Sequence, residues 1–435
     1  MRIKRVLAPL LALMLALWAL AGAEEERAIY VLATNGSAIL ADETGRMLIR
    51  PGRYASIEPL GESGLYAARR LSGGGLGVIR ASGAPVTEFV YSALACDGAR
   101  VAFTRDDKCG AMTLEGETLI EPVYTRLVSA GEDWLAFKTD PLDDTPDALW
   151  RVSAEGEERL TSLKLSFGPL AMSEGLSEAA DTLGRWGYVD AEGGWAIEPR
   201  FVWCGPFRDG LACAAVAEGM GLIDRQGSWV VEPVYRRIER GAAGEPMLAF
   251  DGQGAALLDP LTGDLIARLP GDDAGFAGDL IRVSDGGRLS LVDDAGQPVY
   301  EAPAEAVGLS AYGGCVILQR AFTQERPFAL IGADGVLRGD WRELSPAGVC
   351  EGRAYFIFSD YEATRADYPA PGLTFYDEAA GTRRYGIVDD LGQVVLENLI
   401  SLRRTGQAVL TAETEDWVGL IRPDGTVILK IERAE

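Results

Sequence analysis

The chain has 435 residues, a formal net charge of −24 and no histidine. The negative charge argues against nucleic acids and anionic lipid surfaces as partners, because both select basic patches. It permits cationic ligands, basic proteins and divalent metals. It also keeps an extended polar surface in solution. The absence of histidine excludes Ser-His-Asp and Cys-His catalysis, histidine-ligated zinc and imidazole acid–base chemistry.

Residues 1–23 have the pattern of a signal peptide. A basic start is followed by an apolar run over 6–19 and then by small residues that fit a cleavage site. The apolar run is short for a spanning helix, which needs about 20 residues. We therefore expect residues 24–435 to be secreted or held at the cell envelope, the alternative being an uncleaved N-terminal membrane anchor. Ala23 stands where a lipoprotein would carry cysteine, which argues against lipidation.

A β-hairpin pattern then returns along the rest of the chain, and its clearest copies are residues 186–199 and 220–233. Each copy has a short strand, a tight turn that closes on glycine, and a second strand that ends in Glu-Pro. Two β-rich runs joined by a short Asp/Gly turn predict a hairpin. Glycine suits the corner because φ is positive there, and proline ends the pairing because it has no N–H to donate.

The pattern occurs about eleven times, at intervals of about 33 to 40 residues with one exception. Its turn glycines are Gly45, Gly83, Gly116, Gly156, Gly193, Gly227, Gly263, Gly296, Gly335, Gly392 and Gly425. Each unit holds three or four short strands and is too small to bury an apolar face alone. Stacking of neighbouring units must therefore supply the core.

A second glycine recurs in the middle of the first strand, directly after Trp186 in the clearest copy. It occupies positions Gly77, Gly110, Gly187, Gly221, Gly386 and Gly419. A glycine inside a strand indicates a bulge or a close approach of another backbone. The residue before it varies and is mostly not aromatic, so a packing register between units is favoured over an aromatic ligand ladder.

Trp186-Gly187-Tyr188-Val189-Asp190, followed by Gly193, Ile197, Pro199 and Phe207-to-Ala212, resembles the bacterial WG-repeat family. The resemblance is specific over 184–235, good over 107–124 and 384–396, and degenerate over most of the remaining chain. It implies an all-β repeat architecture, often in exported or multidomain proteins. It implies no catalytic residues and no cofactor.

The expected fold is therefore all-β, with about eleven short antiparallel hairpin repeats in propeller-like packing. The alternative is an open superhelical β-array, because a single propeller typically has 4–8 blades. The last unit ends close to the C-terminus, which would allow ring closure by strand pairing with the start of the chain.

The long interval between Gly335 and Gly392 predicts an insertion loop near 361–384, the segment expected to contact a partner. Insertions on repeat scaffolds map to loops of one face, often the binding face, and tyrosine-rich loops bury area at low entropic cost. A decorated surface loop is the plain alternative. The candidate contact residues are Tyr361, Tyr368, Phe375 and Tyr376.

Carboxylates are the remaining candidates for chemistry. The doublets Asp272-Asp273, Asp293-Asp294 and Asp389-Asp390 could serve a glycosidase, but adjacent strand residues point to opposite faces and aspartate is favoured in turns. The acidic loop 140–147 could collect calcium oxygens but lacks the EF-hand order. We therefore expect turns and solvated loops here, and no catalytic, cofactor or metal site.

Six cysteines in an exported chain permit disulfides. Cys204 and Cys213 flank one turn and could face each other on neighbouring strands, although all six cysteines also fit as small buried apolar residues.

Two functions are expected from these observations. The first is a non-catalytic scaffold that binds a protein or peptide partner at the cell envelope. The second is a binder of wall or extracellular polysaccharide, in which Trp195 and Trp229, equivalent in adjacent units, would stack on sugars. Core packing is the simpler use of both tryptophans, and a carboxylate-only hydrolase is a remote third possibility. The sequence does not indicate an oligomeric state.

Overall fold

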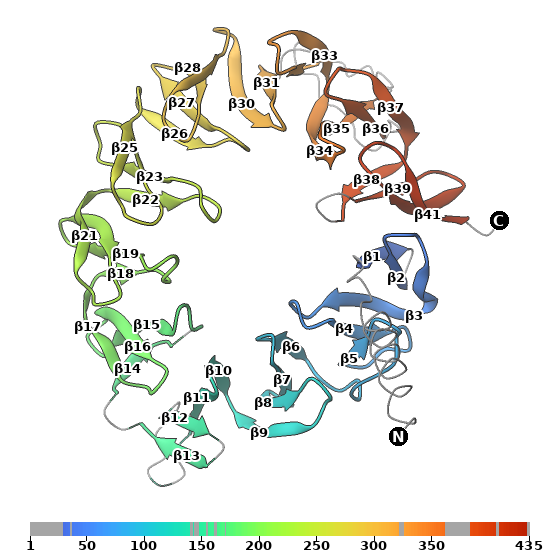
Figure 1. The fold of residues 1–435 in the computed structure, drawn as a ribbon. Helices are drawn as coiled ribbons and strands as arrows, with labels where there is room; N and C mark the ends of the chain where they lie inside the picture. Colours follow the sequence, from blue (N-terminus) through green and yellow to red (C-terminus); the bar gives the residue numbers. More distant parts are fainter. Residues whose placement is uncertain are drawn as a thin grey trace, which may run out of the picture.

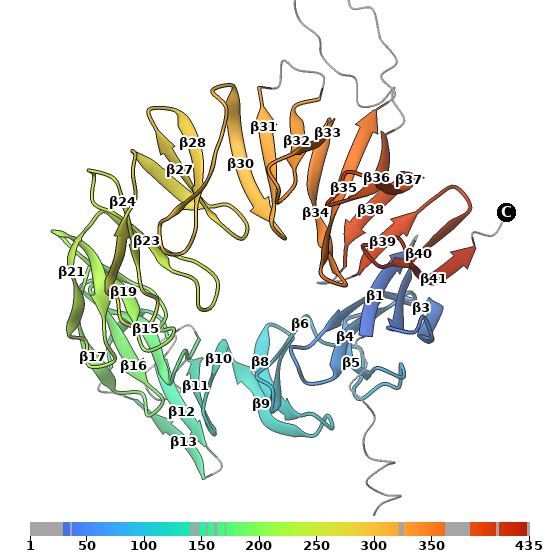
Figure 2. The ribbon, with the colours of Figure 1, turned by 45° about the horizontal axis from the view of Figure 1, so that its top comes forward.

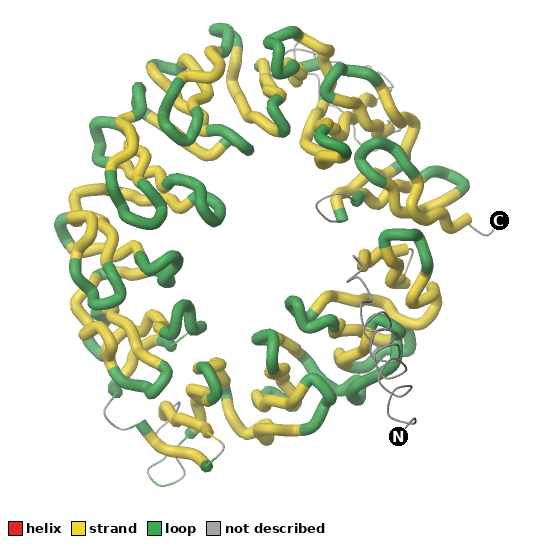
Figure 3. The backbone as a smooth tube through the Cα atoms, viewed as in Figure 1, coloured by secondary structure: helices red, strands yellow, loops and turns green. Residues whose placement is uncertain are grey.

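A computed structural model of the chain describes residues 29–34, 37–139, 142, 148–153, 155–160, 163–169, 171–321, 326–361, 383–405 and 409–432. These residues form strands joined by turns and loops (Figure 3). The described part of the chain contains no helix long and apolar enough to cross a membrane.

The strands form ten antiparallel sheets, which we call blades 1 to 10 in chain order. Blade 1 has five strands: β1 (Ile29–Thr34), β2 (Ser37–Asp42), β3 (Met47–Pro59), β4 (Leu65–Arg70) and β5 (Leu76–Arg80). Blades 2 to 5 have four each: β6 (Ala93–Cys96), β7 (Arg100–Arg105), β8 (Lys108–Thr113), β9 (Thr118–Tyr124); β10 (Arg126–Ala130), β11 (Asp133–Lys138), β12 (Ala148–Ser153), β13 (Gly156–Arg159); β14 (Leu165–Phe167), β15 (Leu176–Asp181), β16 (Trp186–Asp190), β17 (Trp195–Phe201); β18 (Trp203–Cys204), β19 (Ala212–Val216), β20 (Gly219–Ile223), β21 (Trp229–Tyr235).

Blades 6 to 10 repeat the four-stranded plan: β22 (Arg237–Arg240), β23 (Met247–Phe250), β24 (Ala255–Leu258), β25 (Leu265–Arg268); β26 (Asp273–Phe276), β27 (Ile281–Asp285), β28 (Arg288–Val292), β29 (Pro298–Glu301); β30 (Ala306–Tyr312), β31 (Cys315–Arg320), β32 (Phe328–Ile331), β33 (Leu337–Trp341); β34 (Glu343–Cys350), β35 (Arg353–Tyr361), β36 (Arg383–Asp389), β37 (Val394–Leu399); β38 (Ser401–Arg404), β39 (Leu410–Glu413), β40 (Trp417–Ile421), β41 (Val427–Glu432).

The blades stand side by side in a ring, with the first strand of each four-stranded blade toward the centre and the last at the periphery (Figures 1 and 2). The fold is thus a ten-bladed β-propeller, and the propeller-like prediction is confirmed over the open array. Eleven turn glycines fit ten sheets because blade 1 carries two copies of the hairpin. Its long strand β3 pairs with β2 through its first half and with β4 through its second half.

The ring closes where blade 10 meets blade 1. Ile39 and Ala41 of β2 share one apolar cluster with Val409, Leu420 and Leu429 of blade 10. Among the described residues, no strand is exchanged between the two end sheets. Within these residues, apolar packing between complete sheets closes the ring, and not the strand pairing that the position of the last unit would allow.

The hairpin turns follow the local chemistry expected from the sequence. In the turn after β20, the Gly227 N–H donates to the Asp224 carbonyl at 2.9 Å, and the Asp224 carboxylate accepts the N–H groups of Gln226 at 2.9 Å and Ser228 at 2.8 Å. Gly227 has φ +81°, and all eleven turn glycines have positive φ. A short turn that ends in a left-handed glycine joins two strands without splaying them, so the period of the sequence becomes a period of hairpins.

The second recurring glycine marks a close approach of backbones, as predicted. In blade 4, Trp186 pairs with Phe201 and Tyr188 with Ile197, so residues 198–200 bulge opposite Gly187. A Cβ on Gly187 would lie 2.4 Å from the Ile197 carbonyl oxygen and 2.9 Å from the Pro199 nitrogen. Proline is tolerated at the bulge because no N–H is needed there. The Trp-Gly and Glu-Pro parts of the repeat are thus two sides of one contact.

The core lies between blades, as expected for units that cannot bury an apolar face alone. One cluster joins Tyr188 and Phe201 of blade 4 to Cys204 and Ala214 of blade 5. The buried Tyr188 hydroxyl donates across this interface to the Gly205 carbonyl at 2.7 Å. Each blade therefore depends on its neighbours for its core and for part of its polar pairing.

Candidate binding surface

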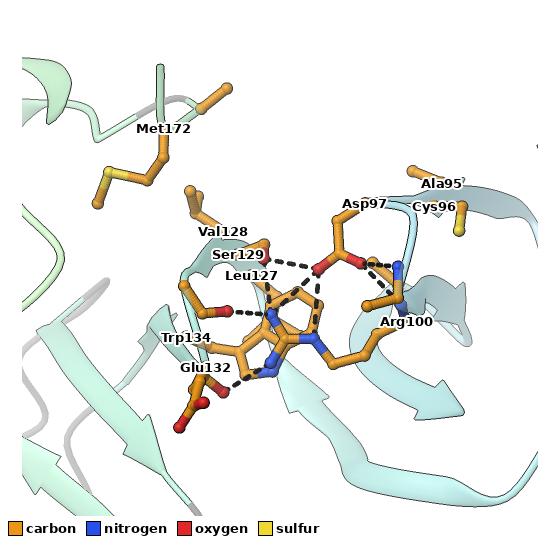
Figure 4. A pocket seen from close by; sticks show the side chains of 14 residues that line it. Ala95, Cys96, Asp97, Arg100, Leu127, Val128, Ser129, Glu132, Trp134 and Met172 are labelled. Carbon is orange, nitrogen blue, oxygen red and sulfur yellow. Dashed lines mark hydrogen bonds and ion pairs between the residues drawn. The ribbon is translucent and has the colours of Figure 1, made fainter. Parts of the chain in front are cut away.

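A pocket of about 780 Å³ lies between blades 2 and 3 (Figure 4). The β6–β7 turn and the β10–β11 turn form its walls, and Ala171 and Met172 of the β14–β15 connection border it from blade 4. These turns join the two inner strands of their blades, so the pocket belongs to the inner part of one face of the ring. Its volume falls within the range of small-ligand pockets.

Arg100 holds the two blades together at the polar wall of the pocket. Its guanidinium donates to the Asp97 carboxylate at 3.1 and 3.2 Å within its own blade. Across the blade interface it donates to the Gly131 carbonyl at 2.6 Å, the Glu132 carbonyl at 2.7 Å and the Ser129 hydroxyl at 2.8 Å. Figure 4 shows these bonds converging on one side chain. A planar guanidinium with several fixed partners is rigid, so this wall is preformed.

An aromatic ring and a carboxylate fix the same guanidinium from two sides. The Arg100 guanidinium carbon lies 4.3 Å from the ring centroid of buried Trp134, a cation–π contact. Burial raises the pKa of Asp97, but hydrogen bonds from the Ser129 hydroxyl, the N–H groups of Ala99 and Arg100 and the Arg100 side chain outweigh it and leave that pKa below its ordinary value. Asp97 is therefore ionised at neutral pH.

The remainder of the pocket is largely apolar. Ala95, Leu127, Val128 and Met172 line it beside the ion pair. Ala95 is exposed while Val128 is buried, so the apolar lining is both accessible and anchored in the core. This arrangement can accept an apolar group and offers Asp97 and Glu132 at its rim.

Trp195 and Trp229 begin the outer strands β17 and β21 and are equivalent, as the repeat predicts. Both are half-buried. Trp195 packs against the cluster that holds Leu135, and Trp229 packs edge-on against Phe201 with ring centroids 5.8 Å apart. Core packing therefore accounts for part of each ring, and their use as glycan platforms stays a prediction.

The possible disulfide between Cys204 and Cys213 is not formed in the structure, where both thiols are free. Cys204 lies opposite Ala214, one residue along from Cys213. Successive residues of a strand point to opposite faces, and the two cysteines accordingly belong to different clusters, on either side of blade 5. Each serves as a small buried apolar residue, and burial raises the pKa of the Cys204 thiol to about 12.

The predicted insertion loop joins the two middle strands of blade 9. β35 and β36 are paired as far as Tyr361 and Arg383, and residues 362–382 lie outside the described residues. The candidate contact residues Tyr368, Phe375 and Tyr376 lie outside the described residues, as does the side chain of Tyr361. Their role stays a prediction.

The carboxylate doublets serve turns and local pairs, as expected. Asp293 accepts the N–H groups of Ala295 at 3.0 Å and Gln297 at 2.8 Å, and Asp389 accepts two N–H groups in the equivalent turn. Of the acidic loop 140–147, only Leu142 is described. Within the described ranges, no three Cys, Asp or Glu side chains gather as a metal-binding group.

Sequence reasoning missed the pocket and two exposed aromatic rings. Asp97 and Arg100 flank an ordinary turn, and nothing local indicates that their partners come from the next blade. Phe167 of β14 and Trp203 of β18 are 46% and 43% exposed on inner strands of neighbouring blades. An alignment of the repeat units with one another could have found Trp203. The first residues of the equivalent strands in blades 3 and 6 are Arg126 and Arg237, and a position that accepts arginine is not a core position.

The model of the WG containing repeat matches residues 186–216 and 220–240. No curated protein sequence matches the chain significantly. Similar solved structures include one described as the eukaryotic initiation factor, with 11% identity, a TM-score of 0.35, and coverage of 86% of this chain and 97% of that one. BamB from Moraxella catarrhalis has 14% identity and a TM-score of 0.26, over 72% of this chain and 93% of its own.

PorZ, described as a surface component of the type-IX secretion system of Porphyromonas gingivalis, has 10% identity and a TM-score of 0.24, over 95% of this chain and 52% of its own. The matched residues run from β16 of blade 4 to β22 of blade 6, and they include the Trp-Gly strand and the Glu-Pro bulge described above. This chain is therefore a β-propeller in which residues 186–216 and 220–240 match the WG containing repeat.

Proposed function

We propose that the chain is an exported, non-catalytic propeller scaffold that binds a protein partner, and that the pocket between blades 2 and 3 receives an apolar side chain of that partner. The observation that carries the proposal is the combination of an accessible apolar lining with a wall preformed by Arg100. Preformed walls lower the entropic cost of binding, and buried anchors in pockets supply most of the energy of protein interfaces.

The state of the polar groups supports a binding role rather than catalysis. Arg100 is engaged by four partner residues, and Asp97 accepts from Ser129, Ala99 and Arg100. A general acid or base needs a pKa near the working pH, whereas Asp97 is held below its ordinary range. Both groups act as fixed structure at the pocket rim.

Export is part of the proposal and rests on the signal-peptide pattern of residues 1–23. N-terminal sequencing of the protein from culture medium and envelope fractions tests it. A mature start at Glu24 supports export with cleavage, and an intact Met1 in the membrane fraction supports the anchor instead. Recovery from the cytoplasm alone would refute export.

The binding proposal is tested by cross-linking the full chain in its source cells and identifying its partner. Ala95→Arg places a charged side chain in the pocket and should abolish the cross-link, since Ala95 is exposed and lines the pocket. Ala93→Arg is the matched control, because Ala93 is exposed on the same strand but does not line the pocket. Equal cross-linking by both variants would contradict the assignment of the pocket.

Polysaccharide binding is a second candidate, favoured by the exposed rings of Trp203 and Phe167. Unlike Trp195 and Trp229, Trp203 leaves 43% of its surface accessible, so it is the better stacking platform. Trp203→Ala should abolish retention on insoluble wall polysaccharide if this candidate is correct. Unchanged retention would leave the half-buried Trp195 and Trp229 to be tested in the same way.

A further inference from the structure

A pocket of about 450 Å³ lies between blades 6 and 7. It is bordered by the start of β22, the β23–β24 turn and the start of β26, all within the continuously described range 171–321. The β22–β23 turn, which is the equivalent of the turn beside the first pocket, lies at the other end of β22. The two pockets therefore lie on opposite faces of the ring.

The two walls of this pocket carry opposite charges at the same position of the repeat. The Arg236 N–H donates to the Phe250 carbonyl at 2.7 Å, and the Asp272 N–H donates in the same way to the Ser284 carbonyl at 2.8 Å. Arg236 and Asp272 are thus equivalent residues of adjacent blades, and both line the pocket. Blade 6 supplies a cationic wall and blade 7 an anionic wall.

The next residue of each wall is also charged, but its charge is compensated within its own blade. The Arg237 guanidinium lies 3.1 Å from a Glu239 carboxylate oxygen and 4.0 Å from the ring centroid of Phe250. The Asp273 carboxylate lies 3.4 Å from the Arg282 guanidinium. One uncompensated charge therefore remains on each wall, on the residue that precedes these two.

The uncompensated pair is Arg236 and Asp272. In the part of the chain that the structure describes, neither side chain forms an ion pair or a hydrogen bond, with the other or with a third residue. Both side chains are exposed. The pocket thus holds a cation and an anion on facing walls without joining them.

The β23–β24 turn positions the cation. A Cβ on Gly252 would lie 2.6 Å from the Arg236 guanidinium carbon, 2.7 Å from its Nη2 and 2.8 Å from its Nε. The guanidinium therefore rests on the glycine backbone, in space that any other side chain would fill. A planar guanidinium in a set position presents the fork of N–H groups that matches a carboxylate.

We propose that the pocket between blades 6 and 7 binds a small zwitterion, a free amino acid or dipeptide. Its carboxylate accepts from Arg236, and its ammonium group donates to Asp272. An ion with a single charge satisfies only one wall, whereas a zwitterion satisfies both. The pocket volume is near the lower end of the range for small-ligand sites, which suits a ligand of this size. The site is independent of the protein-binding proposal.

Isothermal titration of the full chain with glycine and with glycylglycine tests the proposal, in low-salt buffer where exposed charges are least screened. Binding of at least one is the expected result. Each is compared with its amide, which keeps only the ammonium group, and with its N-acetyl derivative, which keeps only the carboxylate. Both derivatives should bind at least about tenfold more weakly. Absence of binding by both zwitterions, or equal binding by either derivative, would overturn the proposal.

Two variants place the binding in this pocket, and each removes one end of the site. Arg236→Gln should weaken binding of the zwitterion about tenfold or more, to the level of its amide, and Asp272→Asn should weaken it to the level of its N-acetyl derivative. The matched controls are Arg46→Gln and Asp107→Asn, the same changes at exposed positions of blades 1 and 2. If the pocket variants bind as well as these controls, the ligand binds elsewhere and the assignment is wrong.

Discussion

Replacing Gly187 with alanine tests the contact on which the repeat is built. The new Cβ would lie 2.4 Å from the Ile197 carbonyl oxygen, 2.9 Å from the Pro199 nitrogen and 3.0 Å from the Glu198 carbonyl carbon. All three atoms are backbone, so no side chain can rotate away. To reach ordinary contact distance, the bulge of β17 must move by about 1 Å. That shift opposes the packing of Ile197 and Phe201, both buried in the core between blades 4 and 5.

We expect Gly187→Ala to lower the free energy of unfolding by about 1–3 kcal/mol, the usual cost of overpacking. Equilibrium denaturation in urea, followed by far-ultraviolet circular dichroism and tryptophan fluorescence, measures the change. The matched control is Gly194→Ala in the same blade. Its Cβ would meet only the Asp190 side chain, at 3.3 Å and beyond, so its stability should stay within about 0.5 kcal/mol of the parent. Equal stability of the two variants would refute the close-approach explanation of the Trp-Gly motif.

Three further changes test the polar contacts between and within blades. Tyr188→Phe should cost about 1–2 kcal/mol in urea unfolding, because it leaves the Gly205 carbonyl without its donor in a buried interface; an unchanged midpoint would contradict this. The pKa of Asp97 is lowered in the folded state, so its stabilising contribution is present above the ordinary aspartate pKa of about 3.9 and is lost as the pH falls through the folded value. The Asp97→Asn variant should therefore lose less stability than the parent on acidification below about pH 3.9. If the free energies of unfolding of the two proteins fall in parallel with pH, this explanation is contradicted. Burial raises the pKa of Glu178, so the folded state disfavours its charged form and stability is lost as the pH rises above its unfolded pKa. The Glu178→Gln variant should therefore be more stable than the parent at about pH 8 but not at about pH 4. A difference in stability between the two proteins that does not change with pH would argue against a titrating group.

The hairpins themselves could be predicted from the sequence because their causes are local. A glycine at the corner relieves the strain of positive φ, and an aspartate such as Asp224 accepts the N–H groups of its own turn. The Trp-Gly and Glu-Pro spacing likewise concerns two strands of one hairpin. These features depend on only a few neighbouring residues, so the repeat period, the all-β class and the close approach at Gly187 could all be predicted from the sequence.

The faces of the strands were harder to predict. Cys204 and Cys213 flank one turn, yet a difference of one residue in register places their side chains on opposite sides of blade 5. The spacing of the two cysteines in the sequence does not fix this register. A disulfide prediction from spacing alone therefore had no physical basis for its choice of face.

The series of antiparallel hairpins follows from the amino-acid sequence, because turn and strand preferences act within each unit. The closure of these units into a ring does not, because closure depends on a small rotation per blade that is set by packing such as that of Ile39 against Leu420. The pocket between blades 2 and 3 arises in the same way. Arg100 meets the carbonyls of Gly131 and Glu132 only because neighbouring blades stand at that angle. This candidate binding site lies between repeats, where contacts between distant residues and not local preference decide the geometry.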